Sequence, residues 1–381
     1  MGAIGGYYDG SGKKRELLGL RAMGRAMAVR GGARQQAYIA ANGGVFCGCG
    51  EERLAEVQMP YTDPSGQLVA VWDGSVRDGF EAMEEIAFGY NRHQAVCPFL
   101  SGGFAVALYD REREQLWLAR DPEGRKPLYY RLEDGGFFFA SELRGLFAWP
   151  CGPVTVNLDA LERHLMESPR PNSVSRLYPS VGQVFPGECM TVSQQGLRRF
   201  YLGGSACREV RPYREERVFA LADDLAEQGL SRSLTDGLYA FEYPQFDPCM
   251  PGLIALLREL AATGVGSVCV EDSSLREDLS YAYERADRLG ARFGLTVLPV
   301  PPSVSVKEGG QHRGAEESLE EMVREEEAIL IPLLGEGLLT SARKTAHWET
   351  RIRRLGMLWQ TALWYRSGGK HFVSAARRIC L

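Results

Sequence analysis

The sequence predicts an α+β protein in two parts, with antiparallel strands dominating the first part and a parallel sheet with helices forming the second. The first part is predicted from residues 103–140, where four short apolar or aromatic runs are separated by turn-forming segments. The second part is predicted from the alternation of helical patterns and short apolar runs after Pro212, which is typical of parallel strands with helical connections.

The first part opens with an amphipathic pattern that predicts a helix over residues 16–30, and a second helix is predicted over 80–90. Four consecutive strands then follow. Because short turn segments such as DPEGRK and LEDGG connect them, we expect a β-meander. Residues 150–210 are irregular and predict a connector with short strands. The predicted strands cover residues 103–109, 115–120, 127–131 and 136–140.

In the second part, strands and helices alternate at the spacing of a parallel sheet. We expect the third helix to end at Gly290, a residue that favours the helix C-terminus. Beyond Pro302 the chain is polar and then helical to about residue 366, with a glutamate-rich helix followed by arginine-rich segments that we expect to attract it. The predicted helices cover 214–230, 251–262 and 277–289, and the predicted strands 237–241, 265–270 and 295–300.

Composition narrows the class of protein. The chain has 381 residues with 44 basic and 49 acidic side chains, a net charge of −5, which argues against nucleic acid as its main partner. We expect no membrane association, because no apolar run approaches the roughly 20 residues of a membrane span. The start of the chain lacks the pattern of a secretory signal, so a cytoplasmic location is expected. Nine cysteines and five histidines lack metal-ligand spacing, so no metal site is predicted.

One segment carries a specific resemblance. The run LARDPEGRKPLYY at 118–130, followed by FASEL at 139–143, resembles a signature of glutamine-hydrolysing asparagine synthetases, where it lies in the class II glutamine amidotransferase domain. The start MGAIGG and Val29–Gly32 (VRGG) are similar to other motifs of that domain, and Leu358–Arg366 is similar to the end of the family's synthetase domain.

The resemblance implies a fold for each part. Residues 1–205 are expected to form an Ntn-hydrolase-like αββα sandwich, the class II glutamine amidotransferase-like domain with its connector. Residues 206–381 are expected to form a reduced, ATP-pyrophosphatase-type α/β domain of the adenine nucleotide α-hydrolase-like kind. We expect this domain to be truncated, because a short connector after residue 300 replaces a long stretch of the family's synthetase domain.

The resemblance also implies that the glutaminase chemistry is lost. The family uses a cysteine at the mature N-terminus as nucleophile, and Gly2 stands at that position here, so no catalytic residue is predicted. The remaining positions form a vestigial glutamine pocket, in which an acidic side chain replaces the asparagine of the family's oxyanion hole. These positions are Arg53, Asp73, Gly74 and Ser75.

The ATP loop of the family is aligned with a segment that cannot serve the same purpose. The glycine-rich loop that would hold pyrophosphate corresponds to residues 243–249, where two prolines remove N–H donors and two aromatic side chains add bulk. We identify a vestigial ATP loop made of Tyr243, Gln245, Phe246 and Asp247.

Two functions remain open. The first is an asparagine synthetase-like protein that has lost both activities, needs no cofactor, and acts as a binding or regulatory partner of a protein or peptide, or forms a homodimer. The alternative is a divergent ATP-dependent amide-forming ligase, of asparagine synthetase or peptide-modifying cyclase type, that uses ATP and Mg²⁺ at a rebuilt site. Its cleft would lie where parallel strands end, at Glu271 and Asp272, with Asp247 and Arg53 as further candidates.

Overall fold

The computed structural model describes residues 2–10, 17–32, 34–49, 59–74, 84, 86–87, 90, 102–133, 135–166, 173–201, 218–219, 227–246, 250–264, 266–271, 279–300, 313–369 and 371. The chain forms two compact units. The first comprises Met1–Gly152, Ser180–Glu215 and Leu279–Glu284, and the second comprises Pro153–Pro179, Glu216–Asp278 and Arg285–Leu381. The second unit therefore includes a segment, 153–179, that the sequence assigns to the first domain.

The first unit is built on two antiparallel sheets. In order across the first sheet, the strands are β10 (Val181–Gln183), β8 (Tyr129–Glu133), β9 (Gly136–Ala140), β1 (Gly2–Asp9), β3 (Gly43–Cys49) and β2 (Gln35–Ile39). In order across the second, they are β12 (Gly196–Tyr201), β11 (Glu188–Ser193), β7 (Gln115–Arg120), β6 (Phe104–Asp110), β5 (Leu68–Gly74) and β4 (Tyr61–Thr62).

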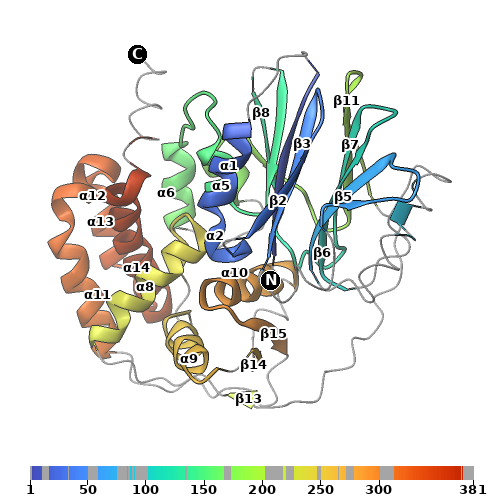
Figure 1. Cartoon of the computed structure of the whole chain (residues 1–381). Coiled ribbons are helices and arrows are strands. Elements are labelled where there is room, and N and C mark those ends of the chain that lie inside the picture. The colour runs from blue at the N-terminus through green and yellow to red at the C-terminus, as the bar shows by residue number, and fades with distance from the viewer. Residues whose placement is uncertain are drawn as a thin grey trace. The chain divides into compact units, whose positions relative to one another are not determined.

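The two sheets pack face to face and share one hydrophobic core. Ile4 and Val45 of the first sheet belong to the same buried cluster as Val71, Val106 and Trp117 of the second. Strands β1, β5 and β6 are buried along their whole length because both of their faces are covered. The opposite face of the first sheet is covered by helices α1 (Leu17–Ala26), α2 (Ala28–Gly31) and α5 (Leu143–Ala148) (Figure 1).

The four strands predicted between residues 103 and 140 are confirmed, but the predicted meander is wrong. Strands β6 and β7 pair in the second sheet, whereas β8 and β9 pair in the first. The segment 121–128 carries the chain from one sheet to the other. On its other side β9 pairs with β1, at the start of the chain, so no local pattern could have indicated that pairing.

The predicted helix over 16–30 is confirmed as α1 and α2, which meet at Met27. Of the predicted helix over 80–90, the described residues Glu84, Ile86, Ala87 and Tyr90 are helical, and the others lie outside the described part of the chain. Ile86, Ala87 and Tyr90 are buried and belong to the same hydrophobic cluster as the strands of the two sheets.

The second unit contains a sheet of three parallel strands, β13 (Val218–Phe219), β14 (Ser267–Glu271) and β15 (Thr296–Val300). Its helices include α6 (Leu158–Met166), α7 (Ser173–Leu177), α8 (Glu227–Phe241), α9 (Met250–Ala262), α11 (Arg313–Glu325), α12 (Glu327–Leu334), α13 (Glu336–Arg343) and α14 (Trp348–Trp364), followed by a π-helical turn at Tyr365–Gly369. Helix α10 (Leu279–Phe293) begins in the residues of the first unit and ends in those of the second.

The strand predicted over 237–241 is wrong, because these residues form the end of α8. The first parallel strand is instead β13, which lies inside the helix predicted over 214–230. Leu230, Leu234, Leu238 and Phe241 recur at helical spacing and are all buried, so the apolar run is one face of a helix.

The predicted helix end at Gly290 is also wrong, because α10 continues to Phe293 and is followed by Gly294 with a φ of +71°. A Cβ at position 290 would lie 2.5 Å from the carbonyl oxygen of Leu295. Gly290 therefore permits the close approach of the chain that enters β15.

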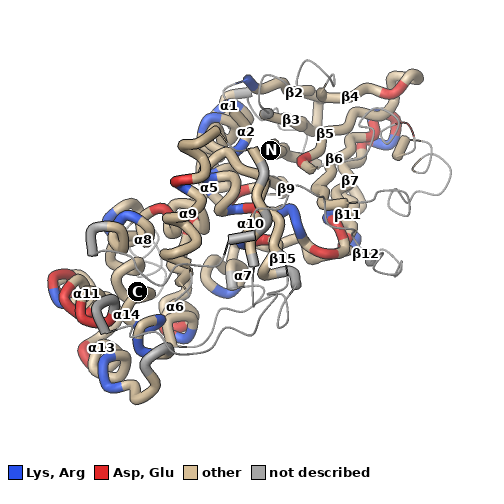
Figure 2. The backbone as a smooth tube through the Cα atoms, turned by 90° about the horizontal axis from the view of Figure 1, so that it is seen from below, with Lys and Arg blue, Asp and Glu red and all other residues tan. Residues whose placement is uncertain are grey.

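The expected attraction between acidic and basic helices is confirmed within the second unit. Arg343 of α13 forms ion pairs with Glu320 and Glu327, and Arg351 of α14 pairs with Glu316 of α11. Figure 2 shows the acidic and basic segments of α11 and α13. None of the helices that the structure describes is long and apolar enough to cross a membrane.

Candidate functional site

Three residues from separate elements meet where β1 begins. Gly2 opens β1, Arg30 lies in α2, and Asp73 is next to last in β5. The N–H of Gly2 donates to Asp73 Oδ1 at 3.0 Å, and Arg30 Nε donates to the carbonyl oxygen of Gly2 at 2.9 Å. Both backbone polar groups of Gly2, the residue that the sequence resemblance aligns with the family's nucleophile, are therefore bound by buried side chains.

Arg30 and Asp73 also form an ion pair in the interior. Arg30 Nη2 lies 2.5 Å from Asp73 Oδ2, and neither side chain is exposed. Lys126 Nζ lies 3.9 Å from Asp73 Oδ1. Burial by itself would raise the pKa of Asp73, but Arg30, Lys126 and the N-terminal amine hold this pKa well below its usual range. These cations thus favour the ionised form of the Asp73 carboxyl group.

Of the four predicted pocket residues, the structure describes Asp73 and Gly74, which are adjacent at the end of β5. Gly74 has a φ of +136°, and a Cβ there would lie 2.0 Å from the carbonyl oxygen of Gly103. Glycine is required at this position by backbone conformation and by close approach. Arg53 and Ser75 lie outside the described residues, so the complete pocket stays a prediction.

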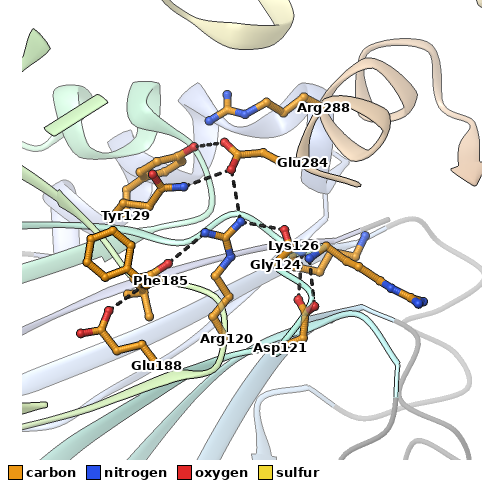
Figure 3. Close-up of polar contacts among 12 residues, drawn as sticks. Arg120, Asp121, Gly124, Lys126, Tyr129, Phe185, Glu188, Glu284 and Arg288 are labelled. Carbon is orange, nitrogen blue, oxygen red and sulfur yellow. Dashed lines mark hydrogen bonds and ion pairs between the residues drawn. The ribbon is translucent and has the colours of Figure 1, made fainter. Parts of the chain in front are cut away.

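The family signature contributes a second polar cluster in the first unit (Figure 3). Arg120, at the end of β7, is fully buried. Its guanidinium donates to the carbonyl oxygens of Val184 at 2.9 Å and Gly124 at 2.7 Å, and to Glu284 Oε2 at 3.2 Å. Arg120 therefore joins the turn that follows β7, the segment that follows β10 and the beginning of α10.

Glu284 is the acceptor at the centre of this cluster. Besides Arg120, Tyr129 Oη donates to Glu284 Oε1 at 2.7 Å, and Gln183 Nε2 donates to Oε2 at 3.0 Å. On the preceding residue of α10, the ring of Tyr283 lies 4.5 Å from the Arg125 guanidinium. These contacts are charge-assisted hydrogen bonds and a cation–π pair, and they hold the start of α10 in the first unit.

Asp121 organises the turn that carries the signature. Its Oδ1 accepts the N–H of Arg125 at 2.9 Å and its Oδ2 accepts the N–H of Lys126 at 3.1 Å. Burial raises the pKa of Asp121 despite the neighbouring Arg120 guanidinium and these N–H donors. The signature residues thus have a structural role in the geometry observed here.

The segment predicted as the vestigial ATP loop follows α8, not a parallel strand, and its described residues are buried. The N–H of Gln245 donates to Gln360 Oε1 of α14 at 2.9 Å. The ring of Phe246 packs against Gly356, where a Cβ would lie 2.6 Å from it. His164 Nε2 of α6 lies 2.8 Å from the carbonyl oxygen of Pro244.

Tyr243 is buried with its neighbours, its ring packing edge-on against those of His164 and Phe241. The segment 243–246 is therefore integrated into the helical core of the second unit. Asp247 lies outside the described residues.

Of the residues predicted for the cleft of the alternative ligase, the structure describes only the backbone of Glu271. Glu271 ends β14, where its backbone is opposite Val300 of β15, but its side chain lies outside the description. Asp272 lies outside the described residues too. The convergence of these carboxylates on one cleft stays a prediction. Among the residues that the structure describes, no group of three or more His, Cys, Asp or Glu side chains is placed to hold a metal ion.

Three residues central to these clusters were not assigned a role from the sequence. Arg30 was visible only as part of the VRGG motif, Glu284 only as part of a helix, and Gln360 only as part of the final helical segment. The one available signal was a polar residue within an apolar helical pattern, as at Gln360, which indicates a buried hydrogen-bonding role.

Comparisons with known proteins match part of the chain. The family described as "Glutamine amidotransferase domain" matches residues 86–201. Asparagine synthetase [glutamine-hydrolyzing] 3 of Bacillus subtilis is 30% identical over 115 residues, which cover 30% of this chain and 19% of that protein. Putative asparagine synthetase [glutamine-hydrolyzing] 1 of Methanocaldococcus jannaschii is 41% identical over 68 residues, which cover 18% of this chain and 12% of that protein.

Among solved structures, the glutamine phosphoribosylpyrophosphate amidotransferase of B. subtilis, complexed with ADP and GMP, is 12% identical with a TM-score of 0.40, covering 81% of this chain and 67% of that chain. The sequence matches span about a fifth or less of the length of the curated relatives. With the two antiparallel sheets, the family match gives the first unit an Ntn-hydrolase-like glutamine amidotransferase fold. Residues 86–201 thus match a glutamine amidotransferase domain, and parts of the chain are similar to curated glutamine-hydrolysing asparagine synthetases.

Proposed function

We propose that this protein is a non-catalytic asparagine synthetase-like protein, without glutaminase or synthetase activity, that acts by binding a protein or peptide partner. The observation that carries the proposal is the contact of Asp73 and Arg30 with Gly2. The position where the family's nucleophile stands has no side chain, and a buried ion pair takes up its backbone groups. An ionised Asp73 also opposes the charge that amide hydrolysis develops.

The second unit supports the same proposal. The N–H of Gln245 is used by Gln360, and the Phe246 ring is packed against Gly356, so neither is available to a phosphate group. We propose that this unit is a truncated domain of the adenine nucleotide α-hydrolase-like kind that needs neither ATP nor Mg²⁺. In this proposal the protein works in the cytoplasm, and its partner is a protein, a peptide or a second copy of the chain.

The direct test is a glutaminase assay of the full-length protein, with Gly2→Cys and Gly2→Cys/Asp73→Asn as companions. A Cβ at position 2 would have its nearest neighbour, Asp73 Oδ1, at 3.4 Å, which is ordinary van der Waals contact, so the backbone there accepts a side chain. We expect no glutamate release from the natural chain or from the single variant, whose nucleophile would still face the Asp73 carboxylate. Glutamate release by the natural chain would overturn the proposal.

A thermal unfolding scan with Mg-ATP separates the proposal from the amide-forming ligase. A ligand at 100 times its Kd adds about 2.7 kcal/mol to the free energy of unfolding, which is readily seen as a rise in Tm. We expect no rise with Mg-ATP or with glutamine. A saturable rise with Mg-ATP would instead support the ligase.

A further inference from the structure

Three arginines and one aspartate line a cavity of about 400 Å³ in the second unit. Arg232, Thr235 and Asp236 come from α8, Arg258 comes from α9, and Arg292 lies near the end of α10 with Phe293 beside it. Three guanidiniums against one carboxylate leave the lining with a net charge of +2. No step of the proposed function uses this cavity.

Asp236 holds two of the arginines in fixed positions. Arg258 Nη2 lies 2.6 Å from Asp236 Oδ2, whereas Arg292 binds Oδ1 through Nε at 3.1 Å and Nη2 at 2.8 Å. The Arg292 guanidinium also lies 4.6 Å from the centre of the Tyr239 ring. The side chains of Arg258 and Arg292 stay 24% and 33% exposed, so part of each guanidinium faces the cavity. Pre-positioned arginines lose less entropy when they bind an anion.

Arg232 completes the cluster from one helical turn before Asp236. Among the described residues, no acidic side chain pairs with Arg232, and its side chain is exposed at the cavity. Thr235 donates its hydroxyl to the carbonyl oxygen of Ser231 at 2.9 Å. The cavity thus offers one arginine that pairs with no described acidic side chain, and two arginines whose orientation is set by the same carboxylate.

We propose that this cavity binds a small molecule that carries a phosphate monoester. A phosphate dianion matches the net charge of the lining, and its oxygens match the forked donors of guanidinium groups. The volume is that of a small-molecule site. This inference is independent of whether the family's two activities are lost.

The test is a titration of the full-length protein with inorganic phosphate, phosphoserine and serine at constant ionic strength, measured by calorimetry and by ³¹P line broadening. We expect phosphate and phosphoserine to bind at one site and serine not to bind. Arg232→Gln should weaken binding about tenfold through loss of one charge-assisted contact, without disturbing the Asp236 ion pairs. Arg324→Gln, which removes a 70% exposed arginine on α11, is the matched control and should leave the affinity unchanged.

Two results would overturn the proposal. One is the absence of saturable phosphate binding, or equal affinities in the Arg232→Gln and Arg324→Gln variants. The other is a phosphoserine peptide that binds much more tightly than free phosphoserine. That result would assign the cavity to a phosphorylated protein and not to a small molecule. The ³¹P signal reports binding directly, so the result does not depend on any enzymatic activity.

Discussion

The Glu284 carboxylate accepts a hydrogen bond from the Arg120 guanidinium at 3.2 Å, and it accepts two more from Tyr129 and Gln183. Arg120 is fully buried, so its positive charge must be balanced by nearby acidic groups, which are Glu284 and the neighbouring Asp121. Residues of the signature segment 118–130 therefore bind the first turns of α10.

We expect Glu284→Gln to lower the free energy of unfolding by about 3 kcal/mol, because it leaves a buried guanidinium with less opposite charge. Tyr129→Phe should cost less, about 1.5–3 kcal/mol, since it removes one hydrogen bond to a charged group. Urea unfolding at neutral pH measures both. Glu112→Gln, at an exposed turn residue, is the control and should change stability by less than about 0.5 kcal/mol. An effect of Glu284→Gln no larger than that of the control would contradict the role of the cluster.

The Arg30–Asp73 pair predicts a pH dependence at the acid end. The pKa of Asp73 in the folded protein lies below its value in the unfolded chain, so its stabilisation is complete above the unfolded pKa, near 3.8. That contribution is lost as the pH falls through the lower, folded pKa. In Asp73→Asn the unfolding free energy should fall by about 3–5 kcal/mol at pH 7, because Arg30 is left buried without its partner. Below pH 4 the variant should lose less stability per pH unit than the natural chain, as measured by urea unfolding across a pH series. A parallel loss in both proteins would rule out Asp73 as a source of acid sensitivity.

Because the Phe246 ring packs directly against Gly356, we expect a larger residue at position 356 to destabilise the protein. In Gly356→Ala the new Cβ would lie 2.6 Å from the Phe246 ring, so the ring or the helix must shift, at a cost of about 1–3 kcal/mol. Gly337→Ala is a matched control, because that helical glycine has no atom within 4 Å of the added Cβ. It should stabilise the protein by up to about 1 kcal/mol through helix propensity. Thermal unfolding of the two variants should therefore shift the Tm in opposite directions, and equal shifts would show that the ring is not constrained.

The ion pairs of Arg343 predict a small, salt-dependent effect. Arg343 lies 2.7 Å from both Glu320 and Glu327 but remains partly exposed. Arg343→Gln should lower the unfolding free energy by about 0.5–1 kcal/mol at low salt, and by less in 0.5 M NaCl, because salt screens exposed charges. Arg324 is 70% exposed and its ion pair with Glu320 is 3.8 Å long, so Arg324→Gln should have no measurable effect. A loss that is unchanged by salt would point to packing of the arginine stem and not to charge.

The strands between residues 103 and 140 could be predicted because aromatic runs and turn residues are local signals. Their distribution over two sheets could not, because β9 pairs with β1 and β7 with β11, both distant in sequence. The apolar run at 237–241 was assigned to a strand for a related reason. Five apolar-rich residues fit a strand as well as one face of a helix, and packing against the rest of the second unit decided for the helix.

The sequence by itself determined which residue types are present at the family's motif positions: glycine at position 2, an acid at position 73, and prolines and aromatic residues at 243–249. These facts need no coordinates, because the presence of a nucleophile or an N–H donor follows from residue identity. Only the tertiary structure decided that Asp73 meets Arg30, that Glu284 meets Arg120, and that Arg258 and Arg292 meet at Asp236. Charges so far apart in the chain find their partners through the packing of whole elements, and the cost of burying a charge without a partner selects the arrangement.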